Sequence, residues 1–288
     1  MSTQIAPLRT PELERQLDEL ERNGYVMIEN AIEPDLLARV TEIVNRVQAE
    51  EEAAGNAGAD GEIHTLEIID RDRTLADLMV NPRVFPLICS ALGWNIHLYH
   101  SHIDVHPPLT APPKPVWRWH QDGGRQNLEI ETQPTRPKLS VKVAYFVSDA
   151  SQPDRGNMLV IPGSHLSNTL PRPEHPELGF EQPEGHVQVL AAPGTACVFD
   201  RRIWHGRSEN MSQVTRKGVF MGYTYRWMRP RHSHAPDAGY SDLDPVQAQL
   251  LGTSTTQLGH WIPKEEDVPL KAWMRENGLI DPTNPAHR

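Results

Sequence analysis

The hydrophobic residues change their spacing along the chain near position 95. Before it, apolar residues recur every three or four positions, which is the spacing of helices that bury one face. Thr10 and Pro11 predict the start of a first helix, and Gly24 predicts its end. Pro34 opens a second helix, and helical spacing continues over 74–92. The first third of the chain is therefore predicted to be helical.

From position 95 onward the apolar residues form short runs separated by Pro, Gly and Asp, a pattern typical of β-strands. Strands are predicted over 96–105, 139–147, 158–161, 187–190, 196–199 and 219–225. Helical spacing returns in the tail, over 245–251 and 270–277. Because the predicted strands follow one another without helices between them, the pattern favours a jelly roll or barrel over alternating β/α units.

These parts predict a single domain over residues 1–288. A helical part spans about 10–92, a jelly-roll core about 95–228 and a helical tail 229–288. We expect the acidic, glycine-bearing stretch 50–61 to be a surface loop, because the pieces beside it are too small to fold alone. The expected fold is mainly β with flanking α-helices, a double-stranded β-helix of the jelly-roll, cupin-like type.

Composition narrows the class of protein. There are 28 Lys and Arg against 38 Asp and Glu, a net charge of −10, so nucleic-acid binding through a broad basic surface is not expected. The 2 cysteines cannot build a disulfide framework or a four-thiolate zinc site, which favours a reducing compartment. No apolar run approaches the roughly 18 residues of a membrane span, and no signal peptide is legible. We expect a cytoplasmic protein with no membrane partner.

The candidate chemistry begins with a histidine and a carboxylate two residues apart, His120 and Asp122. Residues i and i+2 of an extended segment point to the same side, so this pair can bind one metal ion together. The spacing also occurs elsewhere: His102 precedes Asp104 in a predicted strand, and His175 precedes a glutamate in a loop. A non-haem Fe(II) site needs a further histidine as its third ligand.

A later histidine completes the pattern. Arg216 follows His205 by eleven residues and stands just before an apolar run. A guanidinium there can bind the distal carboxylate of a dicarboxylic co-substrate through two hydrogen bonds. No other histidine downstream of Asp122 has an arginine at this spacing. His205 is therefore the candidate third ligand, and Arg216 the candidate ligand of the co-substrate.

With these motifs the sequence resembles the phytanoyl-CoA dioxygenase family of Fe(II)/2-oxoglutarate-dependent oxygenases, in its bacterial branch. The similarity covers about residues 15–230 and rests on four motifs in the same order. The motifs are Asn23-Gly24-Tyr25-Val26, His120-Gln121-Asp122, the stretch 156–165 that ends in Pro-Gly-Ser-His, and His205 with Asn210, Ser212 and Arg216. Four ordered motifs are far more specific than any one of them.

The resemblance implies roles for single residues. His120, Asp122 and His205 would hold iron, Arg216 would bind 2-oxoglutarate, and His165 would belong to a structural turn. Related halogenases have glycine or alanine at the carboxylate position, where this chain has Asp122. Hydroxylation or a related oxidation is therefore expected, and halogenation is not.

Several residues keep two interpretations. Arg207 stands where the family often has serine or alanine; it would add positive charge to the co-substrate pocket, or point elsewhere and bind an anionic substrate. Lys142 would face the interior or the solvent. An apolar cavity would suggest a terpenoid or polyketide substrate, and both cations inside would suggest a carboxylate, phosphate or amino acid. His232 and His234 would form a second metal site or lie in a simple loop.

The implied function is an Fe(II)- and 2-oxoglutarate-dependent dioxygenase. It would use O2 to hydroxylate, or otherwise oxidise, an unactivated C–H bond of a small molecule in bacterial secondary metabolism, with succinate and CO2 as co-products. The alternative is a non-catalytic jelly-roll module that binds a metal or a small molecule. The substrate, the oligomeric state and the choice among hydroxylation, desaturation, cyclisation and epoxidation stay open.

Overall fold

Two antiparallel β-sheets form the centre of the computed structural model, in which residues 8–111, 113–130, 137–231 and 239–288 are described. The larger sheet has the strand order β1-β7-β4-β9-β3-β2, and the smaller sheet has the order β6-β5-β8. The strands of the larger sheet are β1 (Tyr25–Ile28), β2 (Ile63–Leu66), β3 (Ile96–His106), β4 (Ser140–Phe146), β7 (Ala196–Asp200) and β9 (Arg216–Tyr225). Those of the smaller sheet are β5 (Met158–Val160), β6 (Val187–Gln188) and β8 (His205–Arg207). The predicted mainly β jelly-roll fold is confirmed.

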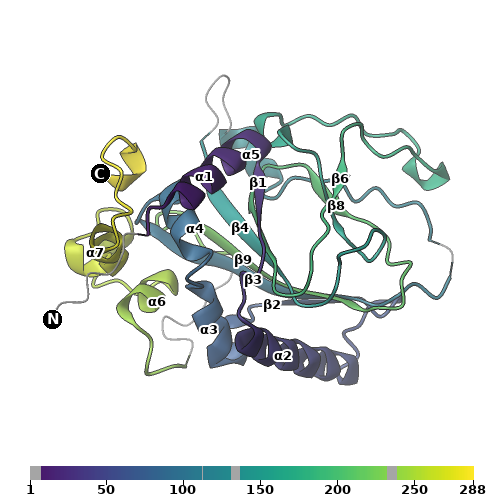
Figure 1. The fold of residues 1–288 in the computed structure, drawn as a ribbon, viewed down its shortest axis with the longest axis horizontal. Coiled ribbons are helices and arrows are strands. Elements are labelled where there is room, and N and C mark those ends of the chain that lie inside the picture. Colours follow the sequence, from purple (N-terminus) through teal and green to yellow (C-terminus); the bar gives the residue numbers. More distant parts are fainter. Residues whose placement is uncertain (1–7, 112, 131–136, 232–238) are drawn as a thin grey trace.

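Helices cover the outer face of the larger sheet (Figure 1). They are α1 (Pro11–Asn23), α2 (Pro34–Ala53), α3 (Arg73–Met79), α4 (Phe85–Leu92), α6 (Pro245–Leu250) and α7 (Pro269–Glu276). A further helix, α5 (Arg125–Ile130), lies against the segment that carries Asp122. Buried residues of α1, α2, α3 and α4 form one apolar cluster with strands of the larger sheet. This packing leaves the inner face of the larger sheet turned toward the smaller sheet.

The ends of α1 follow from its sequence. The Thr10 side chain accepts a hydrogen bond from the Leu13 N–H, and Pro11 occupies the first turn, as predicted. Gly24 ends the helix with a φ of 77°, a left-handed conformation that glycine adopts without steric cost, and its N–H donates to the Leu20 carbonyl. The chain then turns directly into β1.

Strand β4 shows how the larger sheet divides the interior. Successive side chains of a strand point to opposite faces. Val141, Val143 and Tyr145 join the cluster beneath the helices, whereas Phe146 belongs to a second apolar cluster on the inner face. Lys142 points to that inner face too and is only 5% exposed. A lysine therefore sits inside the molecule, where its charge needs a partner.

The structure departs from the predicted elements mainly at short polar segments. Strands β2 and β8 and helix α5 were not expected, and α2 extends through 50–53, where a loop was predicted. Pro86 lies in the first turn of α4, the one helical position at which proline is well tolerated. Strand β2 has two polar residues, His64 and Thr65, among its four and is defined by its pairing with β3.

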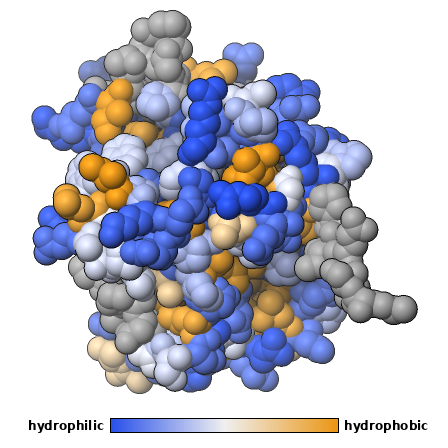
Figure 2. All heavy atoms as spheres, turned by 90° about the vertical axis from the view of Figure 1, so that its left-hand side faces the viewer, coloured by the Kyte–Doolittle hydropathy of each residue, from blue (hydrophilic) through white to orange (hydrophobic). Residues whose placement is uncertain are grey.

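The outer surface is mixed in character. On the face shown in Figure 2, apolar residues form separate patches between hydrophilic ones. Among the helices of the described residues, none has both the length and the apolar composition that crossing a bilayer would need.

Candidate active site

The three predicted metal ligands, His120, Asp122 and His205, lie together. Their candidate ligand atoms are all within 4.8 Å of one another. The two imidazole rings have centroids 4.2 Å apart, and Nε2 of His205 is 3.7 Å from Oδ2 of Asp122. A pair of backbone hydrogen bonds between His120 and His205 joins the two segments, at 2.9 and 3.0 Å. Residues far apart in the sequence thus form one cluster, here called the triad.

The triad histidines are oriented by backbone carbonyls. Nδ1 of His120 is 2.8 Å from the Arg118 carbonyl oxygen, and Nδ1 of His205 is 2.9 Å from that of Ile203. A carbonyl oxygen only accepts, so Nδ1 carries the proton and Nε2 keeps its lone pair. Burial, with a smaller contribution from the neighbouring imidazole of His120, lowers the pKa of His205 to about 4. Near neutral pH this imidazole is uncharged, as a metal ligand must be.

Asp122 is held as a carboxylate by Lys142. The Lys142 Nζ lies 2.8 Å from Oδ2 of Asp122, and both side chains are largely buried. Burial alone would raise the pKa of Asp122, but the charge and hydrogen bond of Lys142, together with the two neighbouring histidines, outweigh it and lower that pKa below its ordinary value. Two neutral imidazoles and one carboxylate are the ligand set of non-haem Fe(II) sites, so the donor set fits such an ion.

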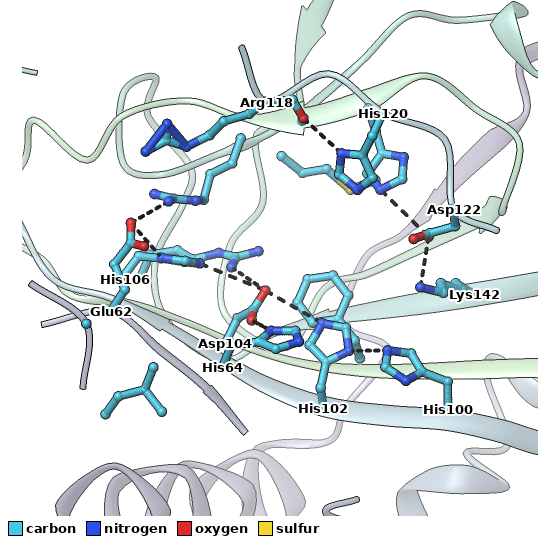
Figure 3. A pocket seen from close by; sticks show the side chains of 18 of the residues that line it. Glu62, His64, His100, His102, Asp104, His106, Arg118, His120, Asp122 and Lys142 are labelled. Atoms are coloured by element: carbon cyan, nitrogen blue, oxygen red, sulfur yellow. Dashed lines mark hydrogen bonds and ion pairs between the residues drawn. The ribbon is translucent and has the colours of Figure 1, made fainter. Parts of the chain in front are cut away.

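The triad borders a cavity of about 810 Å³ between the two sheets. Figure 3 shows His120 and Asp122 on one side of it and His100, His102 and Asp104 on the other. The remaining lining side chains come mainly from β2, β3, β8 and β9 and are predominantly polar or charged. The cavity is therefore a polar chamber with the triad at its wall.

Arg216 lies in the same cavity, at the start of β9. It is 3% exposed, its Nη1 is 3.6 Å from Oδ2 of Asp104, and its Cζ lies 5.3 Å from the centre of the Phe220 ring. Within the described residues, its Nε and Nη1 have no hydrogen-bond acceptor. Buried donors without acceptors are costly, so this guanidinium is suited to an anion that enters the cavity. That property fits the predicted carboxylate-binding role.

Strand β3 contributes a row of side chains that the sequence analysis did not assign to the site. His100, His102, Asp104 and His106 alternate along the strand and all line the cavity. His64 of β2 stands opposite Asp104, with Nδ1 2.6 Å from Oδ1. The alternating pattern within the predicted strand 96–105 was the signal that could have found this row.

His64, His102 and Asp104 form a second group whose ligand atoms lie within 4.8 Å. Its nitrogens already have other contacts: Nδ1 of His64 bonds Asp104, and Nδ1 of His102 lies 2.8 Å from Nε2 of His100. Burial would raise the pKa of Asp104, but hydrogen bonds from the surrounding histidines outweigh it and hold that pKa well below its usual range. Asp104 also faces the Arg216 cation. The triad carboxylate also faces a cation, Lys142, but Nδ1 of each triad histidine bonds a backbone carbonyl and leaves Nε2 for a metal, so the triad is the better metal site.

The remaining candidate residues lie in different places. Arg207 lines the cavity and pairs with Glu62 at 2.6 Å, so its charge is largely matched. His165 is buried against α1, with Nε2 3.0 Å from the Glu21 carbonyl oxygen, and is structural as expected. His175 is exposed and lies 3.2 Å from its own neighbouring glutamate. His232 and His234 lie outside the described residues.

Known proteins resemble this chain over most of its length. "Dioxygenase trt7" of Aspergillus terreus is 24% identical over 265 residues, covering 88% of this chain and 87% of the relative. "Ectoine dioxygenase" of Nocardia farcinica is 23% identical over 237 residues, covering 72% and 76%. A "Probable alpha-ketoglutarate-dependent hypophosphite dioxygenase" of Stutzerimonas stutzeri is 24% identical over 240 residues, covering 73% and 77%.

Solved structures share the fold. EctD of S. alaskensis with bound Fe superimposes with a TM-score of 0.58 and 21% identity, covering 80% of this chain and 82% of EctD. The epimerase SnoN in complex with Fe3+, alpha ketoglutarate and nogalamycin RO gives a TM-score of 0.56 and 19% identity, covering 81% and 93%. The two-sheet architecture of this chain is thus shared with these proteins.

A family profile also matches this chain. The profile described as Phytanoyl-CoA dioxygenase (PhyH) matches residues 20–218, well over half of the chain, and spans both the triad and Arg216. The match confirms the predicted enzyme class, a 2-oxoglutarate-dependent non-haem iron dioxygenase. This chain belongs to the phytanoyl-CoA dioxygenase (PhyH) family.

Proposed function

We propose that His120, Asp122 and His205 hold the iron of this dioxygenase and that Arg216 binds the distal carboxylate of 2-oxoglutarate. Fe(II), 2-oxoglutarate and O2 are the cofactors of the enzyme class. One observation carries the proposal: the triad and a buried guanidinium with unsatisfied donors border the same cavity. A metal ligand set and an anion site in one chamber are what a dicarboxylic co-substrate requires.

The chain's own residues prepare the site in three ways. The carbonyls of Arg118 and Ile203 keep Nε2 of each triad histidine free of a proton. Lys142 pairs with Oδ2 of Asp122 and keeps that side chain a carboxylate. Asp104 keeps a negative charge near Arg216 until the co-substrate carboxylate arrives. When bound, the iron would activate O2, of which one oxygen atom would oxidise 2-oxoglutarate to succinate and CO2 and the other would serve to oxidise an unactivated C–H bond of the substrate.

The cavity favours a small polar substrate. Its lining is rich in histidine, arginine and carboxylate side chains, and Lys142 faces inward, which is the arrangement expected for a polar substrate. A terpenoid or polyketide would leave these buried charges without hydrogen-bond partners, at a cost. We propose hydroxylation, or a related C–H oxidation, of a small polar molecule in bacterial secondary metabolism.

The test is turnover by protein reconstituted with Fe(II) under anaerobic conditions. We expect succinate release from 2-oxoglutarate in the presence of O2, increased by small polar compounds from a substrate panel. His205→Ala should abolish succinate release, whereas His175→Ala, which removes an exposed histidine outside the cavity, should not change it. Unchanged succinate formation in His205→Ala would refute the proposed ligand set.

The same measurement separates the alternative. A non-catalytic module would bind metal and 2-oxoglutarate but release no succinate with any member of the panel. Loss of metal binding in His205→Ala without any turnover by the wild type would support that module instead.

A further inference from the structure

A second cavity, of about 530 Å³, adjoins the triad at Asp122. Asp122, Lys142 and Arg231 line both this cavity and the larger one, so the two are neighbours separated by the Lys142–Asp122 ion pair. The second cavity extends toward Arg229, in the segment that follows β9. Any molecule that occupied it would lie within a few side chains of the candidate iron site.

The described lining of this second cavity is strongly cationic. Lys142, Arg201, Arg229 and Arg231 contribute four positive charges, and Asp122 is the one carboxylate among the described lining residues. Asp122 is already matched by Lys142. The remaining lining groups include hydroxyl donors, such as those of Tyr99 and Ser140. The balance of charge therefore calls for an anion.

Two of these arginines have free side chains. Within the described part of the chain, the guanidinium groups of Arg229 and Arg231 make neither an ion pair nor a hydrogen bond. The backbone around them is nevertheless held, because the Arg231 N–H donates to the Tyr99 carbonyl at 2.9 Å. By contrast, Arg207 and Arg118 of the larger cavity each face a glutamate. Among the described cations that line the two cavities, Arg229 and Arg231 are thus the ones whose side chains have no partner.

We propose that Arg229 and Arg231 bind an anionic group of the substrate, a carboxylate or a phosphate, in the second cavity. The inference rests on the proposed function, since it places the rest of the substrate across the Lys142–Asp122 border beside the triad. It assigns the two ends of the site to different anions: Arg216 takes the co-substrate, and Arg229 and Arg231 take the substrate. The substrate is therefore an anionic small molecule oxidised at a carbon near its charged group.

The test uses inorganic phosphate and acetate as probes. Full-length protein is loaded with Ni(II) in place of Fe(II) and saturated with 2-oxoglutarate, so that Arg216 is occupied, and each probe is titrated by calorimetry. We expect at least one probe to bind, and the Arg229→Gln/Arg231→Gln double variant to bind it at least about tenfold more weakly, since charged hydrogen bonds are lost. Tighter binding of phosphate or of acetate identifies which anion the site prefers.

The matched control removes two positive charges elsewhere. Arg39 of α2 and Arg275 of α7 are exposed, and Arg39→Gln/Arg275→Gln should bind both probes as the wild type does. Equal binding by the wild type and Arg229→Gln/Arg231→Gln, or no binding of either probe, would overturn the inference. So would a loss of probe binding in the control as large as in the arginine pair, because that would reflect net charge alone.

A parallel titration without metal or 2-oxoglutarate, in an Arg216→Met background, keeps the two proposals apart. If Ni(II) and 2-oxoglutarate fail to bind the wild type, the proposed function fails, yet phosphate binding that depends on Arg229 and Arg231 would still support an anion site. If the metal and 2-oxoglutarate bind but neither probe depends on these arginines, the inference alone fails.

Discussion

At the scale of single residues, the site depends on buried charges that neutralise one another. Lys142 and Asp122 form one such pair beside the triad, and Arg216 and Asp104 form a looser one across the cavity. A buried charge that loses its partner is strongly destabilising, whereas an exposed one is not. Substitutions at these four positions should therefore affect stability as well as binding.

Lys142→Met should lower the free energy of unfolding of the metal-free protein by about 3 kcal/mol, because Asp122 is left buried without its counter-charge. Lys138→Met is the control: Lys138 also pairs with a glutamate, but that glutamate is 71% exposed. It should cost less than about 1 kcal/mol. Urea denaturation measures both. Equal costs for the two variants would show that the Lys142–Asp122 pair does not stabilise the site.

Asp104→Asn should make the protein depend more on its co-substrate. The substitution removes the carboxylate nearest to Arg216, so the buried guanidinium lacks an anion until 2-oxoglutarate binds. We expect a lower melting temperature than the wild type without 2-oxoglutarate and a larger upward shift when it is added. Asp242→Asn, at a 70% exposed side chain, is the control. An identical shift in Asp104→Asn and the wild type would contradict this role.

At the scale of elements, α1 and the Pro-Gly-Ser-His turn are built against each other. Gly24 ends α1, and a β-carbon at this position would lie 2.5 Å from Nδ1 of His165. His165 in turn bonds the Glu21 carbonyl in the last turn of the helix. The motif around Gly24 and the motif that ends at His165 are about 140 residues apart in the sequence, and they pack against each other.

Gly24→Ala should therefore lower the stability of the protein more than a glycine-to-alanine substitution at an uncrowded position with a similar φ. Gly55 is the matched control, since it has nearly the same φ, 74° against 77°, but nothing within 4 Å of an added β-carbon. Gly55→Ala should cost about 1 kcal/mol, the usual penalty of alanine in a left-handed conformation, and Gly24→Ala clearly more. Thermal denaturation compares them. Equal losses would mean that His165 yields without cost.

The elements that the sequence predicted well are those with strong apolar periodicity. Helix α1 lies close to its expected bounds because it buries one continuous face, and β3 and β4 do because they are buried along nearly their whole length. Strands β2 and β8 have only 4 and 3 residues, and they exist through pairing with β3 and β5. No local pattern encodes such pairing, so these short polar strands could not be predicted from spacing.

The candidate site was predicted in part. His120, Asp122, His205 and Arg216 were found from spacing and resemblance, and the structure gathers them around one cavity. The β3 row was missed because its histidines looked like chance repeats of a short motif, and only the register of β3 against β2 and β9 brings His64 and Arg216 to Asp104. The Lys142–Asp122 contact also arises from tertiary packing.

At the scale of the whole molecule, one cavity has two clusters on its wall, each made of two histidines and one aspartate. We nevertheless predict one tightly bound metal ion per chain. In the group of His64, His102 and Asp104, Nδ1 of His64 bonds the group's own carboxylate and Nδ1 of His102 bonds His100. Arg216 lies 3.6 Å from the same carboxylate and would repel a cation. Metal content after anaerobic loading and desalting should be close to one in His64→Ala/His102→Ala and near zero in His120→Ala/His205→Ala. Two ions in the wild type, or loss of metal from the first variant alone, would reverse the assignment.

The central claim is that the triad and Arg216 together bind iron and 2-oxoglutarate. Its most direct test is the visible charge-transfer absorption that develops when 2-oxoglutarate chelates protein-bound Fe(II) under anaerobic conditions. We expect this absorption in the wild type and its loss in His205→Ala. In Arg216→Met, half-saturation should need a 2-oxoglutarate concentration at least about tenfold higher. Absorption that persists in His205→Ala, or an unchanged half-saturation in Arg216→Met, would contradict it.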